Sequence, residues 1–63
     1  MKITEIHIGD KVCDKRTKFP MTVVGIWSLL GDPPTKGDVY LDFEGNEGDM
    51  FEMDINDIEF CEE

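Results

Sequence analysis

Carboxylates are the most numerous side chains here that could do chemistry, with 15 Asp and Glu residues among 63. The densest run extends from Asp42 to Asp49, and its spacing invites comparison with a calcium-binding EF-hand loop. Counting from Asp42, the bend position that requires glycine holds Glu47, and the position of the bidentate glutamate holds Met53. The run is better explained as the solvated tip of a β-hairpin, so we expect no metal site.

Other groups suited to catalysis are few. His7 is the single histidine, and its place between two isoleucines is typical of a surface position on a strand. The chain contains no glycine-rich phosphate-binding motif and no nucleophile elbow. A catalytic carboxyl group needs its pKa raised by burial in a cleft, whereas nearly every acid here falls in a turn or on an outward strand position. We therefore expect no enzymatic activity and no cofactor.

The two cysteines, Cys13 and Cys61, are 48 positions apart and belong to no Cys-x-x-Cys motif. With one histidine available, the four ligands of a structural zinc site cannot be assembled. The charged residues among the first ten are unlike a secretory signal, so we expect a cytoplasmic location. Because the cytosol keeps thiols reduced, both cysteines are predicted to be free thiols even where neighbouring strands bring them close.

Charge is distributed unevenly along the chain. Residues 1–36 contain all six bases and four acids, whereas residues 37–63 contain eleven acids and no base. Nucleic-acid affinity depends on Lys and Arg displacing counterions from phosphates, so the net charge of −9 disfavours binding to duplex DNA and to anionic membranes. No apolar run approaches the 18 residues of a membrane-spanning helix.

The first half of the chain predicts two strands and a long loop. Residues 6–8 alternate as at the start of a strand, and residues 11–14 continue with Val12 inward and Cys13 outward. After Pro20, residues 21–27 form the most β-prone stretch, and Gly25 marks a bulge that turns Ile26 inward. The Gly-Asp-Pro-Pro sequence within residues 28–37 predicts a loop.

The second half predicts a hairpin and a short last strand. Residues 38–44 and 49–54 alternate around a turn at 45–48, with the apolar side chains of both strands inward. Residues 54–58 suit one 3₁₀ turn, and residues 58–60 form a last strand with its two apolar ends, Ile58 and Phe60, inward. Together these elements predict an all-β fold, a small five-stranded SH3-like barrel formed by residues 1–63 as a single domain.

Three runs carry a resemblance to a known family: IGDKV at residues 8–12, PMTVVGI at 20–26 and IEF at 58–60. They resemble the YodC-like family of small uncharacterised bacterial proteins. Membership implies a minimal SH3-like barrel without an assigned activity. The loop at residues 28–37 is longer than the family pattern, which suggests that its contacts are specific to this chain.

Two groups of residues are candidate contact sites. The first holds the bulky apolar residues that strand alternation does not place in the core: Trp27, Leu29, Leu30 and Tyr40. For the leucines the sequence leaves two alternatives open, a cap on the open end of the barrel or a partner surface. The second group is a basic patch in and beside the loop after the first strand: Lys11, Lys15, Arg16 and Lys18.

These features favour a non-enzymatic protein that acts through protein contacts. The alternative is a nucleic-acid-linked role, either weak binding through the basic loop at residues 11–18 or mimicry of DNA by the acidic face. A weak homo-oligomer, in which the basic loop of one molecule meets the acidic half of another, also fits the charge distribution.

Overall fold

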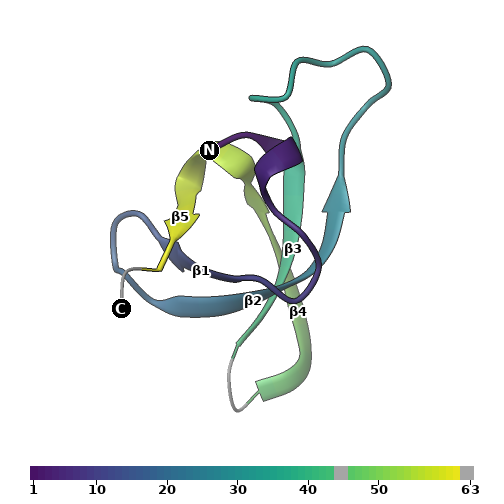
Figure 1. Ribbon diagram of the computed structural model, residues 1–63. Coiled ribbons are helices and arrows are strands. Elements are labelled where there is room, and N and C mark those ends of the chain that lie inside the picture. Colours follow the sequence, from purple (N-terminus) through teal and green to yellow (C-terminus); the bar gives the residue numbers. More distant parts are fainter. Residues whose placement is uncertain (44–45, 62–63) are drawn as a thin grey trace.

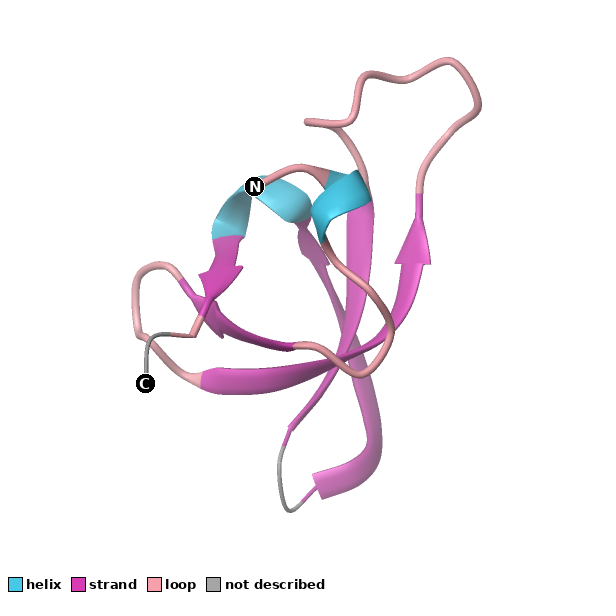
Figure 2. Cartoon of the chain, viewed as in Figure 1, coloured by secondary structure: helices cyan, strands magenta, loops and turns pink. Residues whose placement is uncertain are grey.

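The computed structural model describes the backbone of residues 1–43 and 46–61, and the side chains of residues 1–43 and 50–61. Two 3₁₀ turns and five strands make up these segments (Figures 1 and 2): η1 (Ile3–Glu5), β1 (Lys11–Asp14), β2 (Pro20–Trp27), β3 (Asp38–Phe43), β4 (Asn46–Asp54), η2 (Ile55–Asp57) and β5 (Ile58–Phe60). The predicted all-β class is confirmed, as are the central hairpin and the 3₁₀ turn before the last strand. Within the described segments, none of the helical turns has the length or apolarity to cross a membrane.

All five strands join one antiparallel sheet in the order β4-β3-β2-β1-β5. The sheet is strongly curved, so that the pair β1 and β5 lies on one side of the molecule and the β3–β4 hairpin on the other (Figure 1). Curvature lets so small a sheet bury one face. β4 and β5 occupy the two ends of the strand order, and closure of the sheet into an SH3-like barrel stays a prediction.

Alternating residues fill the core, as period-two patterning requires. The inward positions predicted for Val12, Val39 and Leu41 are confirmed, because all three are fully buried. Phe51 and Met53 of β4 pack against this cluster from its margin. The remaining core residues come from the first residues, β2, η2 and β5: Ile6, Met21, Val23, Ile55 and Ile58.

The bulge predicted at Gly25 is confirmed, because the β2–β3 register shifts between Val23 and Gly25. Tyr40 covers this glycine from β3, and a Cβ atom at position 25 would lie 3.2 Å from Tyr40 Cδ2. The predicted burial of Ile26 is wrong. Ile26 stands opposite the buried Val39 but is exposed, because β2 leaves the core there and continues into the projecting loop (Figure 1).

Three local predictions at the sheet margins also differ from the structure. Residues 6–8 form no strand. Ile6 is buried beside η1, whereas Ile8 points to solvent. Phe60 is 45% exposed rather than buried inward, and it is the last residue of β5, which ends the strand order of the sheet. β4 begins at Asn46 rather than at residue 49. Within the acidic run from Asp42 to Asp49, the side chains of residues 44–49 lie outside the described residues.

The prediction of two free thiols is wrong. Cys13 and Cys61 form a disulfide with a Cα–Cα distance of 5.2 Å. The physical reason is the antiparallel pairing of β1 with β5, which places Cys13 opposite Glu59, two residues before Cys61. The same pairing explains why Cys13 is buried, although strand alternation predicted an outward side chain.

Candidate interaction surface

The loop between β2 and β3 has one half that is tied to the body of the protein. The Ile3 N–H donates to the Pro34 carbonyl at 2.6 Å, and the Ile55 N–H donates to the Gly37 carbonyl at 3.0 Å. A turn within residues 33–36 is closed by a further backbone hydrogen bond of 3.0 Å. This half of the loop is therefore held by η1 on one side and by η2 on the other.

An asparagine in η2 adds a side-chain tether to the same half. Asn56 Nδ2 donates to the Thr35 carbonyl at 3.0 Å and to Asp54 Oδ1 at 3.0 Å. Asp54 Oδ1 also accepts the Asn56 backbone N–H at 2.8 Å, so Asp54 caps η2. These bonds fix Asn56 in the orientation that holds Thr35.

The root of the loop is closely packed. A Cβ atom at Gly37 would lie 2.9 Å from Ile3 Cδ1 and 3.0 Å from the Trp27 carbonyl oxygen. Only glycine fits this contact without movement of the backbone at Trp27. The two ends of the loop therefore meet at a rigid base.

The other half of the loop projects into solvent (Figure 1). The Asp32 N–H donates to the Leu29 carbonyl at 3.1 Å, and Gly31 has φ +93°, the values of a type II turn with glycine at its third position. Leu30 therefore occupies the corner of the turn and is 106% exposed, while Leu29 is 55% exposed. This exposure argues against the capping alternative, and the partner-surface alternative stays a prediction.

Trp27 continues this apolar surface onto the end of β2, where its side chain is 49% exposed. We call Trp27, Leu29 and Leu30 the loop surface. Tyr40, the fourth predicted residue, is half-buried and lies over Gly25. In the β2–β3 register, Trp27 stands opposite Asp38, and Tyr40 stands opposite Gly25. The two aromatic residues are therefore diagonal neighbours on the outer face of the sheet.

Acidic side chains border the loop surface. Asp32 closes the turn, Asp38 faces Trp27 across the strand pair, and Asp54 faces Asp38 from β4. The carboxylate of Glu52, directly opposite Tyr40, raises the pKa of the tyrosine above its usual range. Like charges directly opposite each other destabilise a sheet, so the Asp38–Asp54 pair costs folding free energy.

The predicted basic patch is placed partly as expected. Lys11 is exposed on β1, and the other three bases lie in the loop that follows it. This loop is ordered by Asp14, whose Oδ1 accepts the backbone N–H groups of Arg16 at 2.7 Å and Thr17 at 3.2 Å. The same hydrogen bonds lower the pKa of Asp14 below its usual value. Lys18 forms an ion pair with Glu59 of β5, so the patch is not an uncompensated array of cations.

Two further features of the structure, an aromatic cluster and a cavity, were not predicted from the sequence. Phe19 packs edge-to-face on Phe43 with ring centroids 5.1 Å apart, and Phe43 stacks on Phe51 at 4.5 Å. Strand alternation predicted that Phe43 and Phe51 both point inward, which indicated their contact with each other. Only the tertiary structure shows that Phe19 joins them. The aromatic cluster covers the end of the sheet opposite the loop surface.

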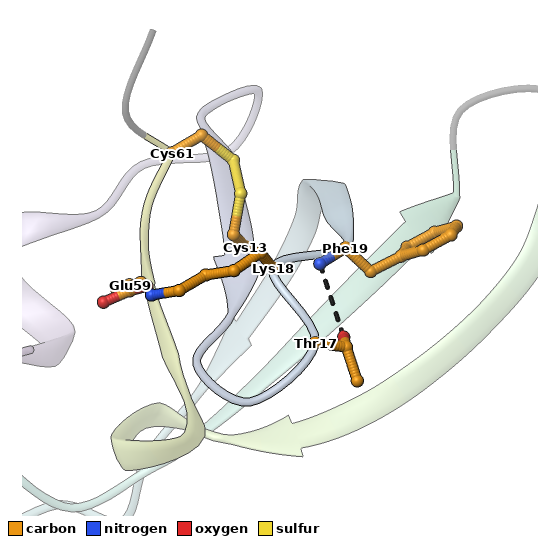
Figure 3. Close-up of a disulfide and its surroundings, with 6 residues drawn as sticks. All are labelled: Cys13, Thr17, Lys18, Phe19, Glu59 and Cys61. Atoms are coloured by element: carbon orange, nitrogen blue, oxygen red, sulfur yellow. Dashed lines mark hydrogen bonds and ion pairs between the residues drawn. A yellow bond between two sulfur atoms is a disulfide. The ribbon is translucent and has the colours of Figure 1, made fainter.

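The second feature is a cavity of about 340 Å³ beside the disulfide. Figure 3 shows the disulfide and its surroundings. Its walls come from the loop after β1 and from the end of β5: Cys13, Lys18, Glu59, Phe60 and Cys61. The predicted barrel, in which the first and last strands neighbour each other, could have indicated that these residues meet.

Comparison of the chain with protein-family models, with curated proteins and with solved structures finds no match. The loop surface and the disulfide cavity therefore have to be interpreted from their own geometry.

Proposed function

We propose that this protein is a non-enzymatic interaction module that presents the loop surface to a partner protein. The observation that carries the proposal is the contrast within one loop: residues 33–37 are tied down, whereas Leu29 and Leu30 are held out in solvent by a defined turn. A turn that is ordered before binding lowers the entropic cost of association. Trp27 beside it is the type of residue that most often supplies a binding hot spot.

The charges around the loop surface define the partner. An apolar groove bordered by Lys or Arg would receive the leucines and would neutralise the carboxylates of Asp32, Asp38 and Asp54. Binding would also relieve the repulsion between Asp38 and Asp54, which face each other across β3 and β4. We therefore propose a basic partner with an apolar groove, in keeping with the net charge of −9 on this chain.

Affinity capture from the source cells tests this proposal, with the recovered partner then titrated against purified variants. The double variant Leu29→Ser/Leu30→Ser should weaken binding by at least tenfold, about 1.4 kcal/mol, without a change in melting temperature. Ile8→Ser is the matched control, because the exposure of Ile8, 70%, lies between those of Leu29 and Leu30 and the residue lies outside the loop surface. Retention of the same partners by the double variant would contradict the proposal.

A charge variant separates the two parts of the proposal. Asp38→Asn should weaken binding and reduce its dependence on salt, because one carboxylate of the border is lost. The same change should slightly stabilise the free protein, since it removes the repulsion with Asp54. Weaker binding together with higher stability is an outcome that damage to the fold cannot produce.

A second candidate function is mimicry of DNA. The observation that favours it is the outer face of the β3–β4 hairpin, where four carboxylates lie at alternating or opposed positions: Asp38, Asp42, Glu52 and Asp54. Such a surface would compete with DNA for a basic groove. Displacement of duplex DNA from the captured partner supports this candidate, whereas simultaneous binding of DNA and this protein to the partner contradicts it.

The family of this protein and its location in the cell are also proposals. We propose membership of the YodC-like family on the runs at residues 8–12, 20–26 and 58–60. We also propose a cytoplasmic location. In the cytosol the Cys13–Cys61 bond would be reduced or short-lived, because stable disulfides are rare there.

A further inference from the structure

The disulfide differs from an ordinary structural crosslink because it forms part of the wall of a cavity. The cavity of about 340 Å³ is lined by both cysteines, by the ion pair of Lys18 and Glu59, and by Phe60. Figure 3 shows the disulfide with Lys18 and Glu59 beside it. This space is large enough to admit a small organic molecule. A reagent in the cavity would therefore lie against the sulfur atoms without any opening of the hydrophobic core.

The two cysteine residues are not equally exposed. Cys13 lies within β1 between two neighbouring strands, and only 8% of its surface is exposed. Cys61 follows the last residue of β5 and is half-buried. Thiol–disulfide exchange requires the attacking thiolate to reach one sulfur atom, and access decides which sulfur atom is attacked. Access favours attack on Cys61, with Cys13 as the leaving group.

The cation beside the disulfide is held in place by an unusual backbone. Lys18 has φ +62°, the left-handed region that residues other than glycine, asparagine and aspartate rarely adopt. Its N–H donates to the Asp14 carbonyl at 2.8 Å, which closes the loop, and its ammonium group pairs with Glu59. The geometry thus holds the Lys18–Glu59 ion pair in the wall of the cavity that both cysteines line. An uncompensated carboxylate near a cysteine would disfavour its thiolate, and the ion pair compensates Glu59.

We propose that the cavity is a thiol-exchange site and that Cys61 is a site of reversible modification by a low-molecular-weight thiol. The thiolate attacks Sγ of Cys61, and a new disulfide forms between the two. The Cys13–Cys61 bond breaks, and its electron pair leaves on Sγ of Cys13 as a thiolate. A second molecule of the thiol then attacks the sulfur atom that the first molecule contributed to the mixed disulfide. That step releases the oxidised small-molecule disulfide and the Cys61 thiolate, so two thiols are oxidised while the protein disulfide is reduced.

The charge of the protein selects the class of thiol. Lys18 and Glu59 offset each other within the cavity, while the whole chain carries a net charge of −9. The thiolate form of glutathione carries a net negative charge and is repelled as it approaches, whereas the thiolate form of cysteamine is a zwitterion without net charge and is not repelled. The site should therefore prefer thiols whose thiolate form has no net negative charge, such as aminothiols, and the preference should decrease as salt screens the field.

Exchange would convert a covalent link into a short strand contact. After reduction, β5 remains attached to β1 through three residue pairs and through the buried Ile58. Cys61 is then no longer linked to Cys13 of β1. The modified state thus differs from the disulfide state mainly at one edge of the sheet and leaves the loop surface unchanged.

The experiment measures adduct formation by mass spectrometry in oxidised protein mixed with cysteamine or glutathione. Rates are compared at equal concentrations of thiolate, because the two thiols ionise differently. We expect cysteamine to react about tenfold faster at low salt, and we expect the difference to shrink at high salt. Peptide mapping should place the adduct on Cys61. An adduct mainly on Cys13, or a rate independent of thiol concentration as in exchange limited by global unfolding, would overturn the proposal.

Two variants, one that removes a positive charge and one that removes a negative charge, test the role of the cavity wall. Lys18→Asn removes the ammonium group and introduces a residue that tolerates positive φ. This variant should slow exchange by about threefold or more, because the Glu59 carboxylate then has no cation to compensate it in the cavity wall. Glu59→Gln should speed exchange with both thiols. Lys15→Asn is the matched control, because it removes one positive charge from the same loop without lining the cavity. Equal rates for Lys18→Asn and Lys15→Asn would show that the cavity wall has no role and would overturn the assignment.

Discussion

The loop surface and the β1–β5 junction are built by opposite means. The loop surface is shaped by local geometry, because one turn of four residues places Leu30 in solvent. The junction is built from residues 48 positions apart, which strand pairing and a disulfide bring together. The comparison teaches that exposure at the loop surface is tolerated because stability comes from elsewhere. Changes at the junction should therefore destabilise the fold, whereas changes at the loop surface should affect binding alone.

The largest expected effect comes from breaking the junction. Cys61→Ser should lower the free energy of unfolding by about 4 kcal/mol, because the crosslink no longer restricts a loop of 48 residues in the unfolded chain. Denaturant titrations with and without a reducing agent measure the loss. The wild type under reducing conditions is the control and should match Cys61→Ser. A variant as stable as the oxidised wild type would contradict the dependence on the junction.

A pair of leucines sharpens the same comparison. Leu41→Ala in the core should cost about 3 kcal/mol, within the 2–5 kcal/mol typical of buried leucine truncations, because Leu41 is fully buried. Leu30→Ala in the loop surface should stay within about 0.5 kcal/mol, as is usual for exposed positions. Thermal melting of both variants measures the difference. A marked loss of stability in Leu30→Ala would restore the capping alternative.

The root of the loop links the two regions, and a smaller change tests it. Gly37→Ala should cost about 1–3 kcal/mol, because the added methyl group would press on Ile3 and on the Trp27 backbone. It should also weaken partner binding by moving Trp27. Ser28→Ala, in the same loop but outside the contact, serves as the control. Unchanged stability and binding in Gly37→Ala would show that the base of the loop is not rigid.

The smallest expected effect is a dependence on pH at the basic loop. The backbone hydrogen bonds from Arg16 and Thr17 lower the pKa of Asp14 in the folded state. Asp14 therefore stabilises the fold above the unfolded pKa of about 3.9, and this contribution is lost as pH falls through the lower folded value. Asp14→Asn, whose amide oxygen still accepts these bonds, should flatten the stability profile in that acidic range. Urea titrations from neutral pH to about pH 2.5 measure it.

Much of the fold could be predicted from local patterns. The alternation at Val39 and Leu41 predicted the central strand because only one face of such a strand meets the core. The short apolar spacing at residues 55–58 predicted η2, and Gly25 predicted the bulge. The marginal residues Ile26 and Phe60 were predicted less well, because burial at the end of a sheet depends on whether another element covers that end.

Residue type and spacing alone placed Trp27 and the two leucines outside the core, and they indicated a loop that holds the leucines. Only the tertiary structure decided that the leucines are exposed, because capping and projection use the same sequence. It also decided that Cys13 meets Cys61 beside Lys18, since the distance between residues 48 positions apart depends on which strands pair. Local patterns set which way a side chain faces on its strand, and long-range pairing sets which side chains it meets.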